Sequence, residues 1–289
     1  MRGNPLTGCP VDRRTLQRVV REALREDIGR GDLTTMFTVP ADTRARGELL
    51  AKQEGVMAGG WAVAECFREN DPGSEFEQLV DEGERFEPGQ RLGDVQGTAR
   101  GLLGAERVAL NFLQHLCGVA TLTRRFADEL EGTGARVTDT RKTTPGLRAL
   151  EKAAVVAGGG SNHRFALYDG ILIKDNHIRL AGGIAQAIER AREGAPHTLR
   201  IEVETAHLGE VREALEAGAD IIMLDNMDNA MMAKAVSVVD GRALVEASGG
   251  MRLERVRAVA ELGVDLISVG RLTHSAPAID ISLELEIVS

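Results

Sequence analysis

Short apolar runs alternate with amphipathic segments through the second half of the chain. Four such runs stand out, at 199–205, 219–225, 243–248 and 264–270. They end on polar residues or glycine that are separated by 21, 23 and 22 residues, namely Glu204, Asp225, Ser248 and Gly270. This spacing is the length of one strand, one loop and one helix. Near-continuous apolar strands alternating with helices predict a parallel α/β sheet covered on both faces.

The repeats favour a TIM-like barrel over a doubly wound open sheet. In a barrel, the carboxyl ends of all strands meet around one mouth, where the polar strand-end residues would gather. An open sheet would instead gather its ligands at a topological switch point. Because every repeat carries its polar residue at the same end, we expect the barrel.

The first half of the chain has a different pattern. A helix is predicted around 16–24, where apolar residues recur at helical spacing, and Gly29 follows as a stop signal. A polar loop is expected at 26–35, and short strands split by glycines at 45–98. The segment 102–130 predicts one or two long helices. This part therefore reads as a smaller α+β domain.

Charge and cysteine content narrow the function classes. The 289-residue chain has a formal net charge of -9, which disfavours nucleic acid and anionic membranes as partners. Its three cysteines are few, far apart and odd in number, which predicts neither a disulfide framework nor a metal site. No signal peptide or apolar run of about 20 residues is recognisable. We therefore expect a cytoplasmic protein.

Cationic residues are concentrated between positions 141 and 174. They are Arg141, Lys142, Arg164 and Lys174, with His163 able to join them. Arginine grips carboxylates with two parallel hydrogen bonds, and lysine supplies a compact charge. Each cation alone could lie on a solvated loop or pair with a nearby aspartate. The whole set, in an acidic protein, predicts a binding site for a substrate with several anionic groups.

Acids and glycines at the strand ends suggest further chemistry. Glu204 and Asp225 could hold Mg²⁺ through water, bind ribose hydroxyls or stabilise a developing cation, and the alternative is that they cap the following helices. Glu202 shares the strand face of Glu204 and competes for the same role. The glycine loops at 248–250 and 270–274 predict a phosphate site. Arg107, on an apolar helix, either snorkels to the surface or enters a cleft.

Together these segments resemble the nicotinate-nucleotide pyrophosphorylase (carboxylating) family, also called quinolinate phosphoribosyltransferase. The resemblance spans nearly the whole chain in order. The motifs that carry it most specifically are Thr140 to Pro145, Gly158 to Arg164 and Leu172 to His177. Others are Glu26 to Thr35, Glu106 to Gln114, Leu224 to Met227, Glu246 to Gly250 and Ser268 to Gly270.

The resemblance implies a reaction and an architecture. Quinolinate and phosphoribosyl pyrophosphate would give nicotinate mononucleotide, pyrophosphate and CO₂, with Mg²⁺ and no organic cofactor. The fold would be an N-terminal α/β sandwich domain at 1–115, with the tail 275–289 packed on it, and an incomplete TIM-like α/β barrel at 116–274. The working unit would be a homodimer in which Arg107 reaches the partner's site.

The resemblance also implies roles for individual residues. The quinolinate carboxylates would be bound by Arg141, His163, Arg164 and Lys174. Thr140 would belong to the substrate site, and Lys142 would face the pyrophosphate or ribose and act in catalysis. Glu204 and Asp225 would be catalytic and serve the ribose and Mg²⁺. The 5′-phosphate would be surrounded by Ser248, Gly249, Gly250, Gly270 and His274.

Two other functions are compatible with the residues. The same scaffold could act on nicotinate or another anionic pyridine, for which fewer cations would suffice. It could also be a non-catalytic phosphometabolite-binding barrel, which would not need Glu204 and Asp225 together. The full set of cations favours the dicarboxylate substrate.

Overall fold

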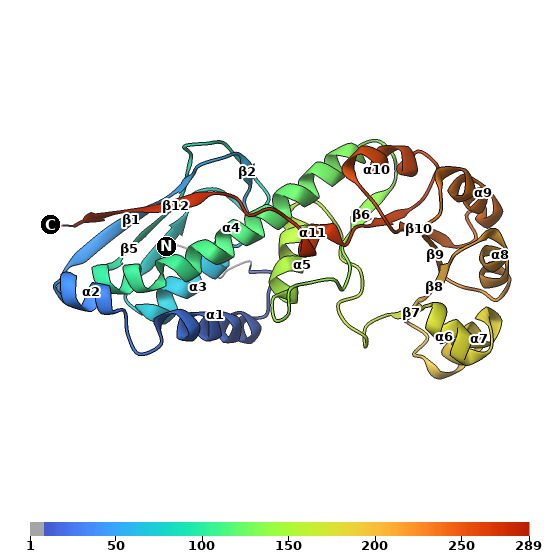
Figure 1. Ribbon diagram of the computed structural model, residues 1–289, viewed down its shortest axis with the longest axis horizontal. Coiled ribbons are helices and arrows are strands. Elements are labelled where there is room, and N and C mark those ends of the chain that lie inside the picture. The colour runs from blue at the N-terminus through green and yellow to red at the C-terminus, as the bar shows by residue number, and fades with distance from the viewer. Residues whose placement is uncertain (1–8, 289) are drawn as a thin grey trace. The chain divides into compact units, whose positions relative to one another are not determined.

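A computed structural model describes residues 9–288 of the chain, and these residues form two compact units (Figure 1). Unit 1 contains the chain up to Arg124, Thr143–Gly159 and the chain from Leu272. Unit 2 contains Arg125–Lys142 and Gly160–Arg271. Each unit is described below by itself.

Unit 2 is built on a six-stranded parallel sheet. Its strands in chain order are β6 (Arg136–Thr138), β7 (Ile171–Ile173), β8 (Ile201–Thr205), β9 (Ile221–Asp225), β10 (Leu244–Ser248) and β11 (Leu266–Ser268). The order in the sheet is β6-β11-β10-β9-β8-β7, and every pair is parallel. The first strand thus lies beside the last, as barrel closure requires, while β6 and β7 remain the two edges of the sheet. This arrangement confirms the incomplete TIM-like barrel.

Helices follow the strands of unit 2 and cover one face of its sheet (Figure 1). They are α6 (Asp175–Ala181), α7 (Ile184–Gly194), α8 (Leu208–Glu216), α9 (Asn229–Val239) and α10 (Leu253–Ala260). Strand residues such as Val203 and Ile222 are buried, and so are the helix residues Val211 and Met232. Since side chains alternate along a strand, the residues on either side of Val203 point to the opposite, inner face of the barrel.

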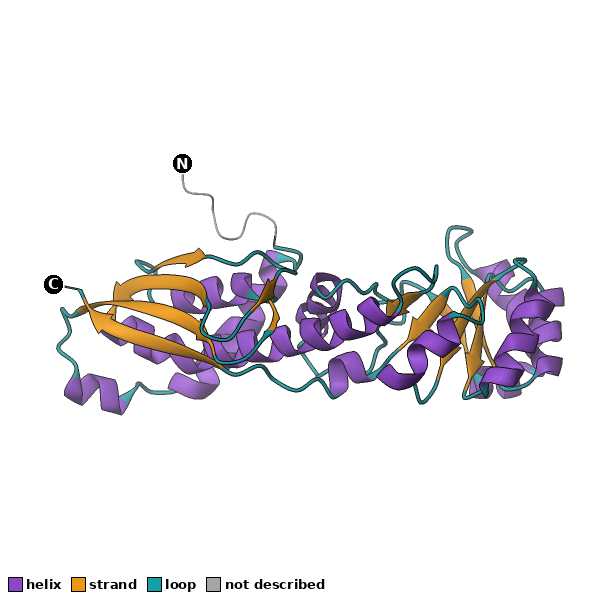
Figure 2. Cartoon of the chain, turned by 90° about the horizontal axis from the view of Figure 1, so that it is seen from above, coloured by secondary structure: helices purple, strands orange, loops and turns teal. Residues whose placement is uncertain are grey.

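Unit 1 contains a four-stranded antiparallel sheet that is layered with helices (Figure 2). The strands are β1 (Arg44–Ala51), β3 (Glu75–Gln78), β5 (Arg91–Thr98) and β12 (Ile281–Ile287), in the order β12-β1-β5-β3. A separate pair is formed by β2 (Gly55–Val56) and β4 (Arg85–Phe86). The C-terminal strand β12 pairs with β1 from Ala45 opposite Ile287 to Ala51 opposite Ile281.

Two capped helices begin unit 1. Helix α1 (Arg13–Ile28) starts at Asp12, whose carboxylate accepts the Thr15 N–H, and it buries the predicted apolar face. Helix α2 (Leu33–Thr38) starts at Asp32, whose carboxylate accepts the Thr35 N–H. The prediction of a loop across 26–35 is therefore wrong at both ends, because the aspartate cap favours a helical turn where the sequence suggested only polar residues.

Helix α3 (Gly60–Asn70) lies within the segment that was expected to contain strands and loops only. Its residues from Gly60 to Phe67 are all buried, so it shows no polar face from which a helical period could be read. Glu82 accepts hydrogen bonds from the N–H groups of Gly59 and Gly60 and satisfies the start of the helix from a distant position. That cap is invisible in the local sequence.

The long helix α4 (Ala99–Glu129) confirms the helical prediction for 102–130 as one continuous element. It runs across positions 115 and 116, and the domain boundary placed there stays a prediction. The remaining helices are α5 (Arg148–Ala157) and α11 (Arg271–His274). Within residues 9–288, no helix combines the length and the apolar character that a membrane crossing needs.

Candidate active site at the carboxyl ends of the barrel strands

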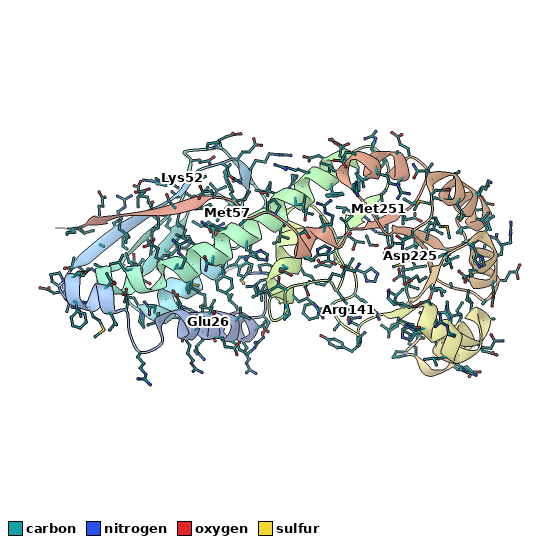
Figure 3. The ribbon with its side chains drawn as sticks, in the orientation of Figure 1. Glu26, Lys52, Met57, Arg141, Asp225 and Met251 are labelled. Carbon is teal, nitrogen blue, oxygen red and sulfur yellow. The ribbon has the colours of Figure 1, made fainter. Side chains whose placement is uncertain are left out.

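The strand-end residues gather on one edge of the unit 2 sheet. Asp225, labelled in Figure 3, ends β9. It is aligned with Ser248 at the end of β10, while Glu204 lies near the end of neighbouring β8. The alternative role of Glu204 and Asp225 as helix caps is wrong. The side chains that cap α8 and α9 are those of His207 and Asp228. Both acids are half-buried, and each accepts a hydrogen bond from a neighbouring side chain through one carboxylate oxygen.

Two loops of unit 2 that carry cations are fastened together at the end of β6. Asp139, which is fully buried, accepts a 2.8 Å hydrogen bond from the His163 N–H. The Ser161 N–H donates to the Val137 carbonyl at 2.9 Å, and Thr138 bridges to Ser161. The segments Thr140-Arg141-Lys142 and His163-Arg164 therefore start from one rigid point, although they are separated by some 20 residues of sequence.

Arg164 lies close to another guanidinium group. Burial lowers its pKa, and the positive charge of Arg141 lowers it further, against the opposite influence of Glu202 and Asp169. The Arg164 Nη1 donates to the Gly170 carbonyl at 3.0 Å, which fixes the side chain. Two neighbouring guanidinium groups of like charge favour a polyanion between them, because the ligand would relieve their repulsion.

Lys174 links the cationic side of the site to the acidic side. It follows β7, and its Nζ donates to Glu204 Oε2 at 2.7 Å. Its backbone N–H donates to His177 Nδ1 at 2.9 Å, which assigns His177 to the start of α6. The lysine side chain is nearly half exposed, so a ligand carboxylate can reach it.

Asn226 joins the end of β9 to the glycine loop at the end of β10. This residue has a φ of 54°, and its side-chain amide donates to Asp225 Oδ2 at 2.7 Å. Its backbone N–H donates to the Ser248 carbonyl at 3.0 Å. Gly249, with a φ of 88°, passes so close that an added Cβ would lie 2.2 Å from Asn226 Oδ1. The acid at the end of β9 and the predicted phosphate loop are thus one packed unit.

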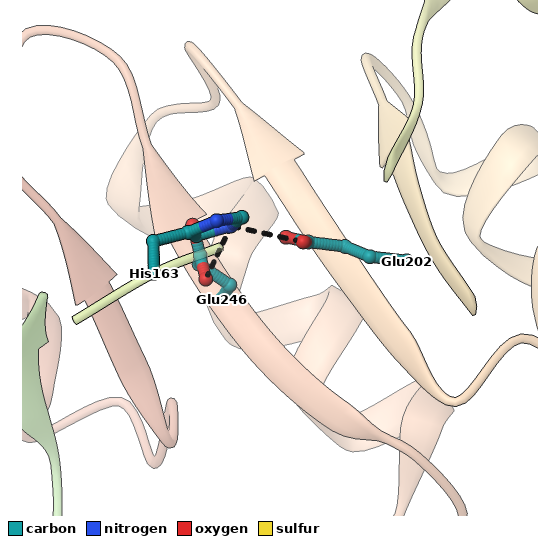
Figure 4. A group of neighbouring side chains, drawn as sticks. All are labelled: His163, Glu202 and Glu246. Carbon is teal, nitrogen blue, oxygen red and sulfur yellow. Dashed lines mark ion pairs between the residues drawn. The ribbon is translucent and has the colours of Figure 1, made fainter. Parts of the chain in front are cut away.

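A buried polar cluster lies on the inner face of the sheet (Figure 4). It consists of His163, Glu202 on β8 and Glu246 on β10, and sequence reasoning did not identify it as a unit. A signal was present, since a glutamate in an otherwise apolar strand that is buried on both faces needs a partner. The partner comes from a distant loop, which the sequence does not indicate.

The predicted site residues divide between the two units. Those in unit 2 are Thr140, Arg141, Lys142, His163, Arg164, Lys174, Glu204, Asp225, Ser248, Gly249, Gly250 and Gly270. Those in unit 1 are Arg107 and His274. Arg107 is exposed on α4, and His274 ends α11 with its Nδ1 2.6 Å from the Ser275 hydroxyl.

Comparison with known proteins assigns the family. The chain matches the quinolinate phosphoribosyl transferase N-terminal domain over residues 32–117 and the C-terminal domain over residues 119–284. It is 42% identical to a Bacillus subtilis protein named probable nicotinate-nucleotide pyrophosphorylase (carboxylating), covering 93% of each chain. It is 42% identical to the Nicotiana tabacum quinolinate phosphoribosyltransferase (decarboxylating) 2a, mitochondrial, covering 94% of this chain and 82% of the relative.

Solved structures agree with the sequence matches. The crystal structure of NadC from Streptococcus pyogenes superposes with a TM-score of 0.91 at 38% identity and covers 100% of both chains. Both domains of the family are therefore present in this chain, in the family's order. The chain belongs to the quinolinate phosphoribosyltransferase family.

Proposed function

We propose that the protein transfers the 5-phosphoribosyl group of phosphoribosyl pyrophosphate to quinolinate, with decarboxylation, giving nicotinate mononucleotide, pyrophosphate and CO₂. This is a step of NAD biosynthesis. The observation that carries the proposal is a set of cations in which Arg164 feels the positive charge of Arg141, and in which Lys174 pairs with the strand-end acid Glu204. The cations suit a dicarboxylate, and the acids at the strand ends suit a ribose that becomes cationic.

Quinolinate would lie on the cationic side of the site. Its two carboxylates would be bound by Arg141, Arg164 and Lys174, with His163 beside them. The rigid attachment of both loops to Asp139 supports this assignment, because preorganised cations lose little entropy on binding. Thr140 would belong to the same substrate site.

Phosphoribosyl pyrophosphate would lie on the side of the glycine loops. Its 5′-phosphate would be surrounded by Ser248, Gly249, Gly250, Gly270 and His274. Gly249 and Gly250 have positive φ angles and no side chains, which lets backbone N–H groups approach phosphate oxygens. Lys142, exposed on its loop, would face the pyrophosphate.

Mg²⁺ would be held by Glu204 and Asp225, in part through water. Carboxylate oxygens are the ligands that this hard cation prefers, and the two acids lie on adjacent strands. The fit requires Lys174 to release Glu204, which quinolinate binding would favour by taking over the ammonium group. The ion would neutralise charge on the pyrophosphate leaving group.

The residues supply the rest of the chemistry by position and charge. As the bond to pyrophosphate breaks, Glu204 and Asp225 would stabilise the positive charge on the ribose. Attack by the ring nitrogen makes a pyridinium, and the CO₂ lost next leaves an electron pair on the ring carbon beside that cationic nitrogen. A proton from water then adds to this carbon and gives nicotinate mononucleotide. The pyridinium itself stabilises the pair, so no organic cofactor is required.

The active unit would be a homodimer in which Arg107 completes the partner's site. Support comes from α2, where Leu33 is 66% exposed and Phe37 is 82% exposed. Apolar side chains exposed together on one short helix favour burial against another surface. The exposed guanidinium of Arg107 is likewise available to an anion from outside its own chain.

We place the enzyme in the cytoplasm. The three cysteines are free thiols, and Cys66 and Cys117 are buried, where desolvation raises their pKa. Free thiols suit a reducing compartment.

A direct assay tests the activity. Purified protein with carboxyl-labelled quinolinate, phosphoribosyl pyrophosphate and Mg²⁺ should release labelled CO₂ and form nicotinate mononucleotide. Nicotinate in place of quinolinate should be a far poorer substrate. Turnover of nicotinate at the same rate would shift the assignment to a monocarboxylate, and binding without turnover would indicate a phosphometabolite-binding protein.

A further inference from the structure

Two buried glutamates converge on His163 from inside the barrel. The His163 Nε2 lies 3.0 Å from Glu202 Oε2 and 3.8 Å from Glu246 Oε2 (Figure 4). The side chains of Glu202 and Glu246 are 6% and 1% exposed, so water cannot hydrate either carboxylate freely. Neither glutamate belongs to the proposed substrate contacts, and the cost of burying both calls for a function or a compensating partner.

The other ring nitrogen of His163 identifies the form of the imidazole. Nδ1 accepts a 2.7 Å hydrogen bond from the backbone N–H of Arg164. An accepting nitrogen carries no proton, so the one proton of the neutral ring is on Nε2 and points toward the two carboxylates. His163 in this arrangement is therefore a neutral donor.

This tautomer argues against a metal ion in the cluster. His163, Glu202 and Glu246 have ligand atoms close enough to surround a cation. A metal would need the Nε2 lone pair, which moves the ring proton to Nδ1 and sets it against the Arg164 N–H. Metal-binding histidines donate from their second nitrogen, whereas this one accepts there.

Burial also changes the chemistry of Glu246. Desolvation, followed by the negative charge of Glu202, raises its pKa to about 7, while the Ser268 hydroxyl and Lys174 act in the opposite direction. A shared proton in this pair would relieve the repulsion between two buried carboxylates. The pair can then persist without a metal, and one oxygen remains to accept the Nε2–H.

The hydrogen bonds continue from His163 to the substrate side. The imidazole of His163 contacts Glu202 through Nε2, and the backbone N–H of His163 donates to the Asp139 carboxylate. Through Nδ1 it fixes the backbone of Arg164, whose guanidinium also donates to the Gly170 carbonyl. A ring that could rotate would leave the Arg164 N–H without its acceptor and loosen that residue.

We propose that Glu202 and Glu246 are positioning residues that hold His163 as its Nε2–H tautomer and thereby fix Arg164 for a carboxylate of the pyridine dicarboxylate. Glu202, at the shorter distance, has the larger part. The role of Arg164 rests on the proposed function, whereas the tautomer of His163 does not.

The test combines the ring signals of His163 with steady-state kinetics of the intact enzyme. Variants Glu202→Leu, Glu202→Gln and Glu246→Leu are compared with Glu216→Gln, an exposed control on α8. Nitrogen-15 spectra, with His163 assigned from a His163→Gln variant, report the tautomer. KM for each substrate and kcat report positioning, and thermal unfolding reports stability.

The wild-type ring should show a proton on Nε2 alone, and added Zn²⁺ should leave its signals unchanged. Glu202→Leu should raise KM for quinolinate about tenfold, the worth of one hydrogen bond to a charged group, with KM for phosphoribosyl pyrophosphate nearly unchanged. Glu246→Leu should act in the same direction but more weakly. Glu202→Gln retains an accepting oxygen and should restore most of the affinity.

Several results would overturn the proposal. They are a wild-type ring protonated on Nδ1 or on both nitrogens, a Zn²⁺ complex of the ring, or a Glu202→Gln variant as defective as Glu202→Leu. If Glu202→Leu does not fold, the wild-type spectrum and the kinetics of Glu202→Gln still test the proposal. A wild-type enzyme that shows the Nε2 proton but does not use quinolinate would reject the proposed function and retain the tautomer.

Discussion

Adding one methyl group at Gly249 should disable the phosphoribosyl side of the site, whereas the same change at Gly250 should not. Both glycines have positive φ angles, of 88° and 58°, so alanine costs about 1–2 kcal/mol of backbone strain at either position. The surroundings differ. A Cβ at Gly249 would lie 2.2 Å from Asn226 Oδ1 and 2.9 Å from its backbone nitrogen, but at Gly250 nothing lies within 4 Å.

The size of the effect follows from this contact. For the new Cβ to reach an ordinary contact distance of 3.4 Å, the Asn226 oxygen must move by about 1 Å. A displacement of that size at a reacting centre can lower the rate about 100-fold. Asn226 holds Asp225 Oδ2 and the Ser248 carbonyl, so the acid and the phosphate loop would move together. We expect Gly249→Ala to lower kcat/KM for phosphoribosyl pyrophosphate about 100-fold and Gly250→Ala by less than about tenfold.

Matched kinetics and thermal unfolding of the two variants make the test. Both variants carry the same kind of backbone strain, and Gly249→Ala should lower the melting temperature further because its Cβ also overlaps Asn226. Kinetics measured at a temperature where both variants are folded should separate them. Equal kinetic defects in the two variants would refute the reasoning. A defect of Gly249→Ala confined to KM for quinolinate would do so as well.

Three further predictions address the assembly, the acids and the pH dependence. A mixture of Arg107→Ala and Lys174→Ala chains should regain activity that each alone lacks, since a hybrid dimer contains one intact shared site; no recovery despite proven subunit exchange would reject Arg107 in the partner's site. Asp225→Asn should lower kcat by about 100-fold or more through lost charge, with unchanged melting, and near-normal turnover would exclude Asp225 from catalysis. Between the ordinary carboxyl pKa of 4.5 and about 7, folded Glu246 retains a proton that the unfolded chain releases. Denaturant titrations should therefore show the wild-type unfolding free energy falling relative to Glu246→Gln as pH rises through this window, and parallel curves would contradict the raised pKa.

Local patterns were sufficient for much of the fold. The strands and helices from β8 to α10 follow from continuous apolar runs and amphipathic repeats, since both faces of a barrel strand are buried. The helix α4 follows from a long helical period. Helix α3 was not predictable in this way, because burial on every side removes the period and its N-terminal partner Glu82 lies far along the chain.

The sequence likewise indicated the residues of the candidate site but not the contacts between them. Residue types alone indicated the cations, the acids at the strand ends and the glycine loops, because such groups are costly in apolar strands unless they bind something. They did not indicate that Asp139 joins two of the loops, that Asn226 packs on Gly249, or that His163 turns toward Glu202.

The sequence by itself determined the alternating strands and helices from β8 to α10, the long helix α4, and which chemical groups stand at the ends of the barrel strands. Periodicity, caps and turn residues act between near neighbours in the chain and can be read there. Only the tertiary structure decided which of those groups meet, that Arg164 feels the charge of Arg141, and which ring nitrogen of His163 carries the proton. Those properties depend on distances between residues far apart in sequence and on burial, and both exist only once the chain has folded.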